Sequence, residues 1–407
     1  MAEAESRLAE VEASLARRRT SPTELPQQSD PTPRVYANLW IQPQFMHTTW
    51  NAAGSPNVAG GELPPGITAN AVTLRSDGTT TNTTLFRLRR TRLRLVGEMN
   101  RYMRAFAEID VFPVGTGNIF LRNVLATGIA HWKSNLRTEF SAGSFKVPLT
   151  HELLEPSRDR PFLERTLTSI AFFPGDRDVG AWAQTTWKPA QTKHTLVADL
   201  AVVNGRTFGE PSSGILPDYN RGKDVVLHAN YDLGPLDVGV GGYFGLGSLT
   251  EPATGTFTDY YRGAVHLEGG VHHKLFPSLG QSRLLTAATY GVNMDRGVRY
   301  SFALPDRASV PGDSVGDKHQ FGYYARIEQD VSRWVTLGAR YELYTTNLAL
   351  PSNLVHGLGG LVSVNFAKGL ASRFEYIHGI DQSHAEGTPV PTRVSDTVFV
   401  WMQARYD

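Results

Sequence analysis

The chain has 407 residues, no cysteine and a formal net charge of +1. The lack of cysteine excludes disulfides, thiolate metal sites and cysteine catalysis, and the near-neutral charge gives no support to nucleic-acid binding, which would need a basic excess. No apolar run reaches the roughly 18 residues that a membrane-spanning helix requires. A transmembrane β-barrel is still allowed, because only alternate residues of its strands face lipid.

The first twenty residues predict a helix. Ala4, Leu8, Val11 and Leu15 follow one another at spacings of four, three and four, with charged and polar residues between them. This spacing is typical of a coiled-coil seam about two heptads long, and a solvated amphipathic helix is the alternative interpretation. The N-terminus has neither the basic region nor the apolar region of a secretory signal. A transmembrane barrel has to be exported, so we expect this chain to be the mature form, from which the signal has been removed, with an added initial Met.

Residues 21–34 contain four prolines and predict a stiff linker. From Val35 onward, apolar and polar residues alternate with a period of two, which predicts strands. About sixteen are expected, near 35–46, 84–99, 102–112, 119–132, 136–147, 177–188, 194–205, 224–234, 237–246, 258–275, 282–297, 317–332, 334–347, 356–370, 371–383 and 392–407.

The gaps between these strands alternate in length. The long gap 47–83 is followed by the two residues 100–101, and 206–223 is followed by 234–236. Tight periplasmic turns on one rim and long external loops on the other are typical of membrane barrels. An even number of strands also returns both termini to the periplasm, where we expect the N-terminal coiled coil.

One basic strand predicts which face lines the barrel interior. Arg90, Arg92 and Arg94 share one face, and Leu93 and Leu95 share the other. An arginine that faces lipid near the midplane costs roughly 2–4 kcal/mol, so the three arginines are expected to face the lumen. No acidic residue lies between them on their own strand, and they are therefore candidates for an anion path.

Other strands place charges on the same inward face. Arg104 is expected to point inward with two acidic neighbours and is a further candidate for the anion path. Later strands carry the pairs Arg326/Glu328, Arg340/Glu342 and Arg373/Glu375. For these pairs we favour mutual neutralisation within the wall.

The stretch 148–176 has no period of two and is rich in charge. A loop of this length in an ordered protein is usually functional, and we expect it to fold inward and narrow the channel. The candidate anion-path residues of this region are Lys146, Arg158, Arg160 and Arg165. Rings of cationic side chains favour anions. Alternatively, these cations pair with nearby acidic residues and only hold the loop to the wall.

Three segments, Phe86–Gly97, Gly143–Pro148 and Phe162–Arg165, resemble the phosphate-selective porin O and P family. The resemblance extends over 35–407, with its specific motifs between 86 and 180. It implies a sixteen-stranded trimeric barrel whose third external loop enters the pore. It also implies passive, anion-favouring diffusion guided by arginine and lysine, with phosphate as one candidate solute.

We therefore predict an all-β fold: a 16-stranded antiparallel transmembrane β-barrel with an inward-folded third external loop, preceded by a short N-terminal α-helical coiled coil. Residues 1–20 form the periplasmic helix, 21–34 the linker and 35–407 the barrel. The predicted location is the bacterial outer membrane. A homotrimer is expected, with Leu8, Val11 and Leu15 contributing to oligomerisation.

The predicted function is an outer-membrane porin for small anions, with no catalytic residue, metal site or cofactor. Its expected partners are small anions, outer-membrane lipid and the cell wall, the last through the N-terminal helix, and no nucleic acid. Two alternatives stay open. One is a general, weakly selective porin. The other is a structural envelope tether or sheath whose N-terminal helix binds a cell-wall or partner component.

Overall fold

The computed structural model describes residues 33–51, 80–111, 119–173, 176–190, 192–205, 222–250, 257–276, 278–294, 318–345, 347–349, 354–382 and 393–406. Within them the chain forms sixteen strands and two short helices. The strands are β1 Arg34–Asn51, β2 Thr80–Asn100, β3 Met103–Val111, β4 Ile119–Lys133, β5 Leu136–Lys146, β6 Arg177–Trp187, β7 Thr195–Val203, β8 Asp224–Asp232, β9 Leu236–Thr250, β10 Phe257–His273, β11 Ser282–Val292, β12 His319–Asp330, β13 Val335–Thr345, β14 Val355–Ala367, β15 Leu370–Asp381 and β16 Arg393–Tyr406. The helices are α2 His151–Leu154 and α3 Leu167–Phe172.

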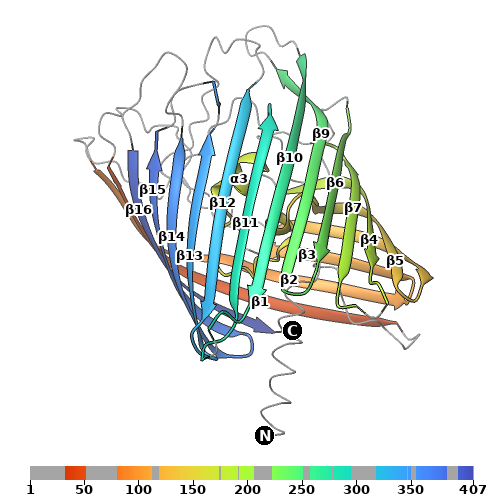
Figure 1. Ribbon diagram of the computed structural model, residues 1–407, viewed down its shortest axis with the longest axis horizontal. Coiled ribbons are helices and arrows are strands. Elements are labelled where there is room, and N and C mark those ends of the chain that lie inside the picture. Colours follow the sequence, from red (N-terminus) through yellow and green to blue (C-terminus); the bar gives the residue numbers. More distant parts are fainter. Residues whose placement is uncertain are drawn as a thin grey trace, which may run out of the picture.

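The strands form one closed antiparallel barrel, in which each strand pairs with its neighbours in the sequence and β1 closes the ring on β16 (Figure 1). The predicted sixteen-stranded antiparallel barrel is therefore confirmed, and every expected strand has its counterpart. The predicted N-terminal helix with Leu8, Val11 and Leu15, and the linker as far as residue 32, lie outside the described residues. No helix in the described part of the chain is long and apolar enough to cross a membrane.

The connections alternate in length around the barrel. β2 and β3 are joined by residues 101–102, and β14 and β15 by residues 368–369. At the opposite rim, β5 and β6 are joined by residues 147–176 and β11 and β12 by residues 293–318. The connection 147–176 is the third of the long ones and is called the β5–β6 loop below.

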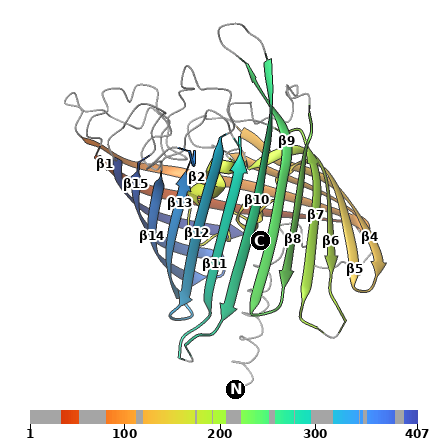
Figure 2. The ribbon, with the colours of Figure 1, turned by 45° about the horizontal axis from the view of Figure 1, so that its top comes forward.

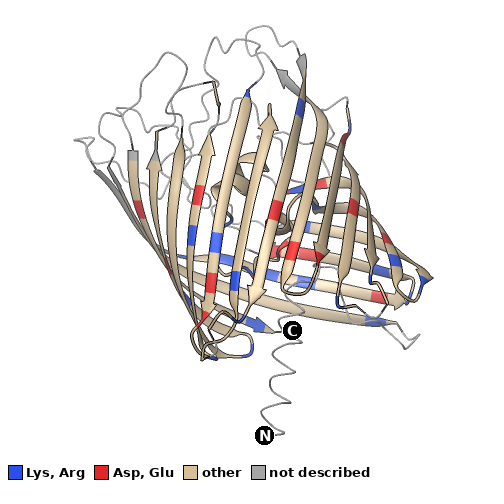
Figure 3. Cartoon of the chain, viewed as in Figure 1, with Lys and Arg blue, Asp and Glu red and all other residues tan. Residues whose placement is uncertain are grey.

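Strand β10 shows how the wall is oriented. Tyr261, Val265 and Leu267 are exposed, whereas Arg262 and His266, on the other face of the strand, are buried. Apolar side chains outside and polar side chains inside are the arrangement of a barrel surrounded by lipid. Figure 3 shows the charged positions spread along the strands rather than confined to their ends. The exposed face of β10 at these positions is thus apolar, and its buried face is polar.

A bulge between β1 and β2 changes this alternation. Gln42 pairs with Arg90 and Pro43 pairs with Leu88, so that Arg89 has no partner on β1. Proline has no N–H to donate to a neighbouring strand, and a bulge is one of the few places in a sheet that tolerates it. The extra residue brings Arg89 as well as Arg90 to the inner side of the wall.

The β5–β6 loop packs against the wall through an apolar surface. Leu153, Leu167 and Phe172 of the loop are buried in one cluster with Trp182 of β6 and Tyr344 of β13. The rings of Phe172 and Tyr344 meet edge to face, with their centroids 5.7 Å apart. In Figures 1 and 2 the loop helices lie inside the ring of strands, and α3 is seen behind β11 and β12.

Each of the two helices of the loop is capped by a threonine, and a buried carboxylate joins them. The Thr150 hydroxyl accepts a hydrogen bond from the N–H of Leu153 at the start of α2, and Thr166 caps α3 in the same way. Threonine is a favourable N-cap because its oxygen satisfies an N–H that has no partner within the helix. The buried Glu152 of α2 accepts from the Thr166 N–H at 3.0 Å and from the Thr166 hydroxyl at 2.5 Å. One carboxylate therefore joins the two helices.

Candidate functional site

Carboxylates of the wall bind the backbone of the β5–β6 loop at three points. Each accepts a hydrogen bond from a loop N–H. The pairs are Glu268 of β10 with His151, at 2.9 Å, Glu342 of β13 with Leu167, and Glu375 of β15 with Leu163, at 2.8 Å. A carboxylate that accepts from a backbone N–H makes a strong, charge-assisted hydrogen bond. The wall therefore holds the loop through its main chain as well as through its apolar side chains.

Donors of the wall bind loop carbonyl groups in the same region. Arg340 donates to the carbonyl of Glu164 at 2.9 Å, Arg373 to that of Arg160 at 2.8 Å, and Gln403 to that of Arg158 at 3.0 Å. These three side chains project inward from β13, β15 and β16. Together with the contacts to β6 and β10, they show that the loop reaches opposite sides of the barrel wall.

Two of the ion pairs expected on the later strands are present. Arg326 and Glu328 approach to 3.1 Å, and Arg340 and Glu342 to 2.6 Å. The Arg373 guanidinium lies 4.4 Å from the Trp401 ring centroid and donates to Ser363 at 3.1 Å.

The carboxylate of Glu164 binds two arginines of β2 at one side of the loop. It binds Arg89 at 2.5 Å and Arg90 at 3.3 Å. Arg160 also acts on it electrostatically. Burial favours the neutral form of Glu164, but Arg89 and Arg90 outweigh burial and hold the pKa of its carboxyl well below its ordinary value. The predicted residue Arg90 therefore contacts an acidic residue of the loop.

Arg92 and Arg104 face acidic residues of other strands. Arg92 binds Asp110 of β3 at 2.9 Å and lies 3.6 Å from Glu108, and Arg104 pairs with Glu139 of β5. Arg92 also donates to the Ser157 hydroxyl of the loop at 2.8 Å. The acidic partners of Arg92 thus lie on the adjacent strand β3, and no acidic residue separates Arg90, Arg92 and Arg94 on β2.

Two other predicted cations, Lys146 and Arg165, bind groups of the loop itself. The Lys146 ammonium donates to the carbonyls of Leu154 and Glu155, at 3.2 and 2.7 Å, just after α2. Arg165 binds Asp176, at the end of the loop, at 2.7 Å. The interpretation in which loop cations pair locally therefore describes the contacts of Arg165. Lys146 is held by backbone carbonyls instead.

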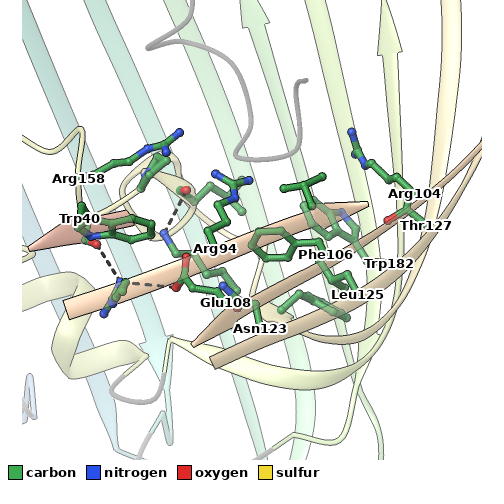
Figure 4. Close-up of a pocket in the computed structure, with 17 residues that line it drawn as sticks. Trp40, Arg94, Arg104, Phe106, Glu108, Asn123, Leu125, Thr127, Arg158 and Trp182 are labelled. Carbon is green, nitrogen blue, oxygen red and sulfur yellow. Dashed lines mark hydrogen bonds and ion pairs between the residues drawn. The ribbon is translucent and has the colours of Figure 1, made fainter. Parts of the chain in front are cut away.

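A pocket lies between the wall formed by β1–β6 and the loop segment after α2 (Figure 4). It brings together five of the eight predicted anion-path residues. They are Arg92, Arg94, Arg104, Lys146 and Arg158. Glu108 is the one acidic side chain that lines it. Cations are therefore in clear excess at this part of the inner surface.

The pocket also has an apolar side, which the sequence analysis did not anticipate. Trp40, Phe106, Leu125, Phe145 and Trp182 line it. Each of them occupies an inward-facing position of its strand. These five residues were not predicted, because only charged residues on the inward face were considered as site residues. The same period of two contains the signal, because these are apolar residues at positions that alternate with lipid-facing ones.

Arg89, Arg122 and Arg177 were also missed as inward-facing cations. Arg122 is the extra residue of a second bulge, because Glu108 pairs with Asn123 and Ile109 with Leu121. It lies 2.8 Å from Asp110, and Arg177 lies 3.4 Å from Glu108. Pro43 could have indicated the first bulge; no comparable signal marks the second.

Residues 69–224, which contain β2–β7 and the loop, match a known family model. It is the model of the phosphate-selective porin O and P family. Over these residues, the match confirms the resemblance found in the sequence. Among curated protein sequences, none matches the chain.

Several solved porins share the fold. An anion-selective porin from Comamonas acidovorans is 13% identical, with a TM-score of 0.56 over 92% of this chain and 100% of that one. The outer membrane channel DcaP of Acinetobacter baumannii is 12% identical, with a TM-score of 0.56 over 93% of this chain and 99% of that one. A trimer form of OmpT from Vibrio cholerae is 10% identical, with a TM-score of 0.53 over 92% and 100%. Identities this low establish the fold alone.

The family match and the closed barrel together support an outer-membrane porin, that is, a channel of the bacterial outer membrane rather than a typical enzyme. The exposed apolar side chains on the outer face of the strands agree with that location.

Proposed function

We propose that this porin lets small anions diffuse passively across the outer membrane, past a constriction formed by the β5–β6 loop. The observation that carries the proposal is the charge of the pocket beside the loop, where five cationic side chains line the surface with one acidic one. In a confined, partly dehydrated pore, fixed cations lower the free energy of an anion far more than they would in open water.

The contacts of the loop support its role as the constriction. It is bound on one side by Arg89 and Arg90 of β2 and, at the opposite point of the closed ring of strands, by Glu268 of β10. A segment held from both sides reduces the cross-section that is open to solutes. Phosphate is a candidate solute because of the family match, and chloride would pass by the same path.

The test is the reversal potential of the purified porin in planar bilayers under a gradient of KCl. We expect the sign that corresponds to chloride permeation and a larger magnitude at low salt, where screening is weakest. A potential of the opposite sign would overturn the anion preference. No conductance at all would favour a structural envelope protein.

A general, weakly selective porin is the second candidate. Most of the inner cations have acidic partners, such as Asp110 for Arg92 and Glu139 for Arg104. Pairing of this kind reduces the field that a passing ion experiences. A reversal potential near zero at both low and high salt would favour this candidate.

Homotrimerisation is proposed from the family resemblance and from the trimer form of the V. cholerae porin. The spacing of Leu8, Val11 and Leu15 supports an N-terminal coiled coil that adds to the barrel contacts. Such a helix would extend into the periplasm, within reach of the cell wall, while outer-membrane lipid covers the exposed apolar side chains of the strands.

A further inference from the structure

The pocket beside the loop has two chemically different sides. Figure 4 shows Arg94 between Trp40 on one side and Phe106 on the other, with Leu125 and Trp182 beyond Phe106. The Arg94 guanidinium lies 4.6 Å from the Phe106 ring centroid, and that of Arg158 lies 5.8 Å from the Trp40 ring centroid. The cations therefore border an aromatic surface.

Hydrated inorganic anions do not need this apolar surface. Chloride and phosphate have no apolar group to bury, and contact with an aromatic wall would only remove water from them. Binding sites for organic molecules, in contrast, are mostly apolar, with a few polar groups that fix the orientation of the ligand. The combination found here fits a ligand that has both a charged and an apolar part.

The position of Glu108 limits the charge of the ligand. Glu108 lines the pocket beside Arg94 and is held 3.6 Å from Arg92 and 3.4 Å from Arg177. A second carboxylate on the ligand would lie close to this fixed negative charge and be repelled. One carboxylate can instead lie toward Arg94 and Arg158 while the rest of the molecule lies against Phe106.

We infer that this pocket is a binding site for organic monoanions with an apolar body, such as aromatic carboxylates. Such a solute would place its carboxylate at Arg94 and Arg158 and its ring across Phe106, toward Leu125. The inference rests on the proposed function, since the anion has to enter the barrel to reach the pocket, and it deepens that function by naming the class of solute.

The experiment measures block of the chloride current through single reconstituted channels by sodium benzoate, sodium acetate and sodium phosphate. Acetate has the carboxylate without the ring, so it serves as the matched probe. If the ring packs against the pocket, benzoate should block at concentrations about tenfold lower than acetate, because burying part of the ring adds the corresponding free energy. Equal block by benzoate and acetate, or tighter block by phosphate, would overturn the inference.

Variants of pocket residues test whether benzoate blocks the current by binding in this pocket. Phe106→Ala should raise the benzoate concentration needed for half block by about tenfold, with a smaller change for acetate. Phe106→Leu should retain part of the affinity, and Leu125→Ala provides a second test if the first variant folds poorly. The control is Phe374→Ala, an exposed phenylalanine on the outer face of β15. Benzoate block that is unaffected by both pocket variants would overturn the assignment of the site.

The reversal potential measured in the same bilayers keeps the two proposals apart. An anion-selective channel without preference for benzoate would contradict only the pocket. A cation-selective channel would contradict the proposed function itself.

Discussion

The Glu375 carboxylate of β15 accepts a 2.8 Å hydrogen bond from the backbone N–H of Leu163, although the two residues are 212 positions apart in the sequence. Glu342 and Glu268 bind the loop backbone in the same way. The inner wall thus contacts the loop's main chain, through hydrogen bonds whose donors are backbone N–H groups and not loop side chains.

Replacing Glu375 with alanine should loosen the loop without opening the barrel. The Leu163 N–H would lose a charged acceptor, which is worth about 1.5–3 kcal/mol, while the strand ladder of β15 is formed by backbone groups. We expect noisier single-channel currents and unchanged strand content by circular dichroism. Glu375→Gln keeps an acceptor oxygen and should behave more like the parent. Quiet currents from the alanine variant would contradict this role.

A methyl group at Gly241 should displace the loop from β9. Its Cβ would lie 2.4 Å from the backbone oxygen of Leu149, and a backbone atom cannot rotate away as a side chain can. Overpacking of this kind costs about 1–3 kcal/mol. We expect Gly241→Ala to increase proteolytic cleavage within residues 147–176. Gly360→Ala is the matched control, since a Cβ there meets nothing within 4 Å. Equal cleavage of the two variants would show that the loop does not depend on this close approach.

Docking of the loop should fail in acid. Arg89 and Arg90 overcome the effect of burial and lower the pKa of Glu164 from its ordinary value of 4.5. A lowered pKa means that the docked loop favours the ionised form, so its contribution is complete above the ordinary value and is lost as pH falls through the lowered one. Currents should become noisy as the pH falls below about 4.

Glu164→Gln tests this interpretation. With no charge to lose, the variant should be noisy already at neutral pH and should respond less to acid. Some response of the variant to acid should remain, because two other carboxylates of the loop also have lowered pKa values despite their burial. Arg326 lowers the pKa of Glu155. Arg165 and Arg177 lower the pKa of Asp176. A variant that matches the parent at every pH would exclude Glu164 from docking.

The wall of the barrel could be predicted because its physics is local. Alternation with a period of two depends only on lipid outside and polar groups inside, so Arg90, Arg92 and Arg94 were placed on the correct face. The bulges could not be placed by the same count, because a single extra residue changes the face of its neighbours. Pro43 is opposite one bulge, but a proline does not say which residue of the partner strand is extra.

The contacts of the loop lay beyond the sequence. Thr150 and Thr166 are recognisable as helix caps, yet nothing near Leu163 indicates Glu375. Such pairs depend on how far the loop extends across the lumen and on which strands of the closed barrel it then contacts. For the same reason the acidic partners of Arg92, which are on β3 and not on β2, were overlooked when only one strand was considered.

Deleting residues 2–20 should leave the oligomer intact but less resistant to heat. A seam of about two heptads is shorter than the roughly three or four that make a stable coiled coil, so barrel contacts must dominate. The measurement is the temperature at which the detergent-extracted oligomer dissociates on an unheated gel. Complete dissociation to monomers on deletion would show that Leu8, Val11 and Leu15 carry more of the assembly than we propose.

Cations of the pocket, and not those of the barrel rim, should set the preference for anions. Arg94 and Arg158 line the pocket, whereas Arg101 and Lys133 are exposed at the rim of the short turns. The double variant Arg94→Gln/Arg158→Gln removes two of the five pocket cations, and the control Arg101→Gln/Lys133→Gln removes the same charge from an open, high-dielectric surface.

We expect the pocket variant to move the reversal potential toward cations, most strongly at low salt, because charges act over longer distances when screening is weak and more strongly in a confined pore. The rim variant should change it much less. Equal shifts in both variants would mean that overall charge, and not the pocket beside the loop, sets the preference of this porin for anions.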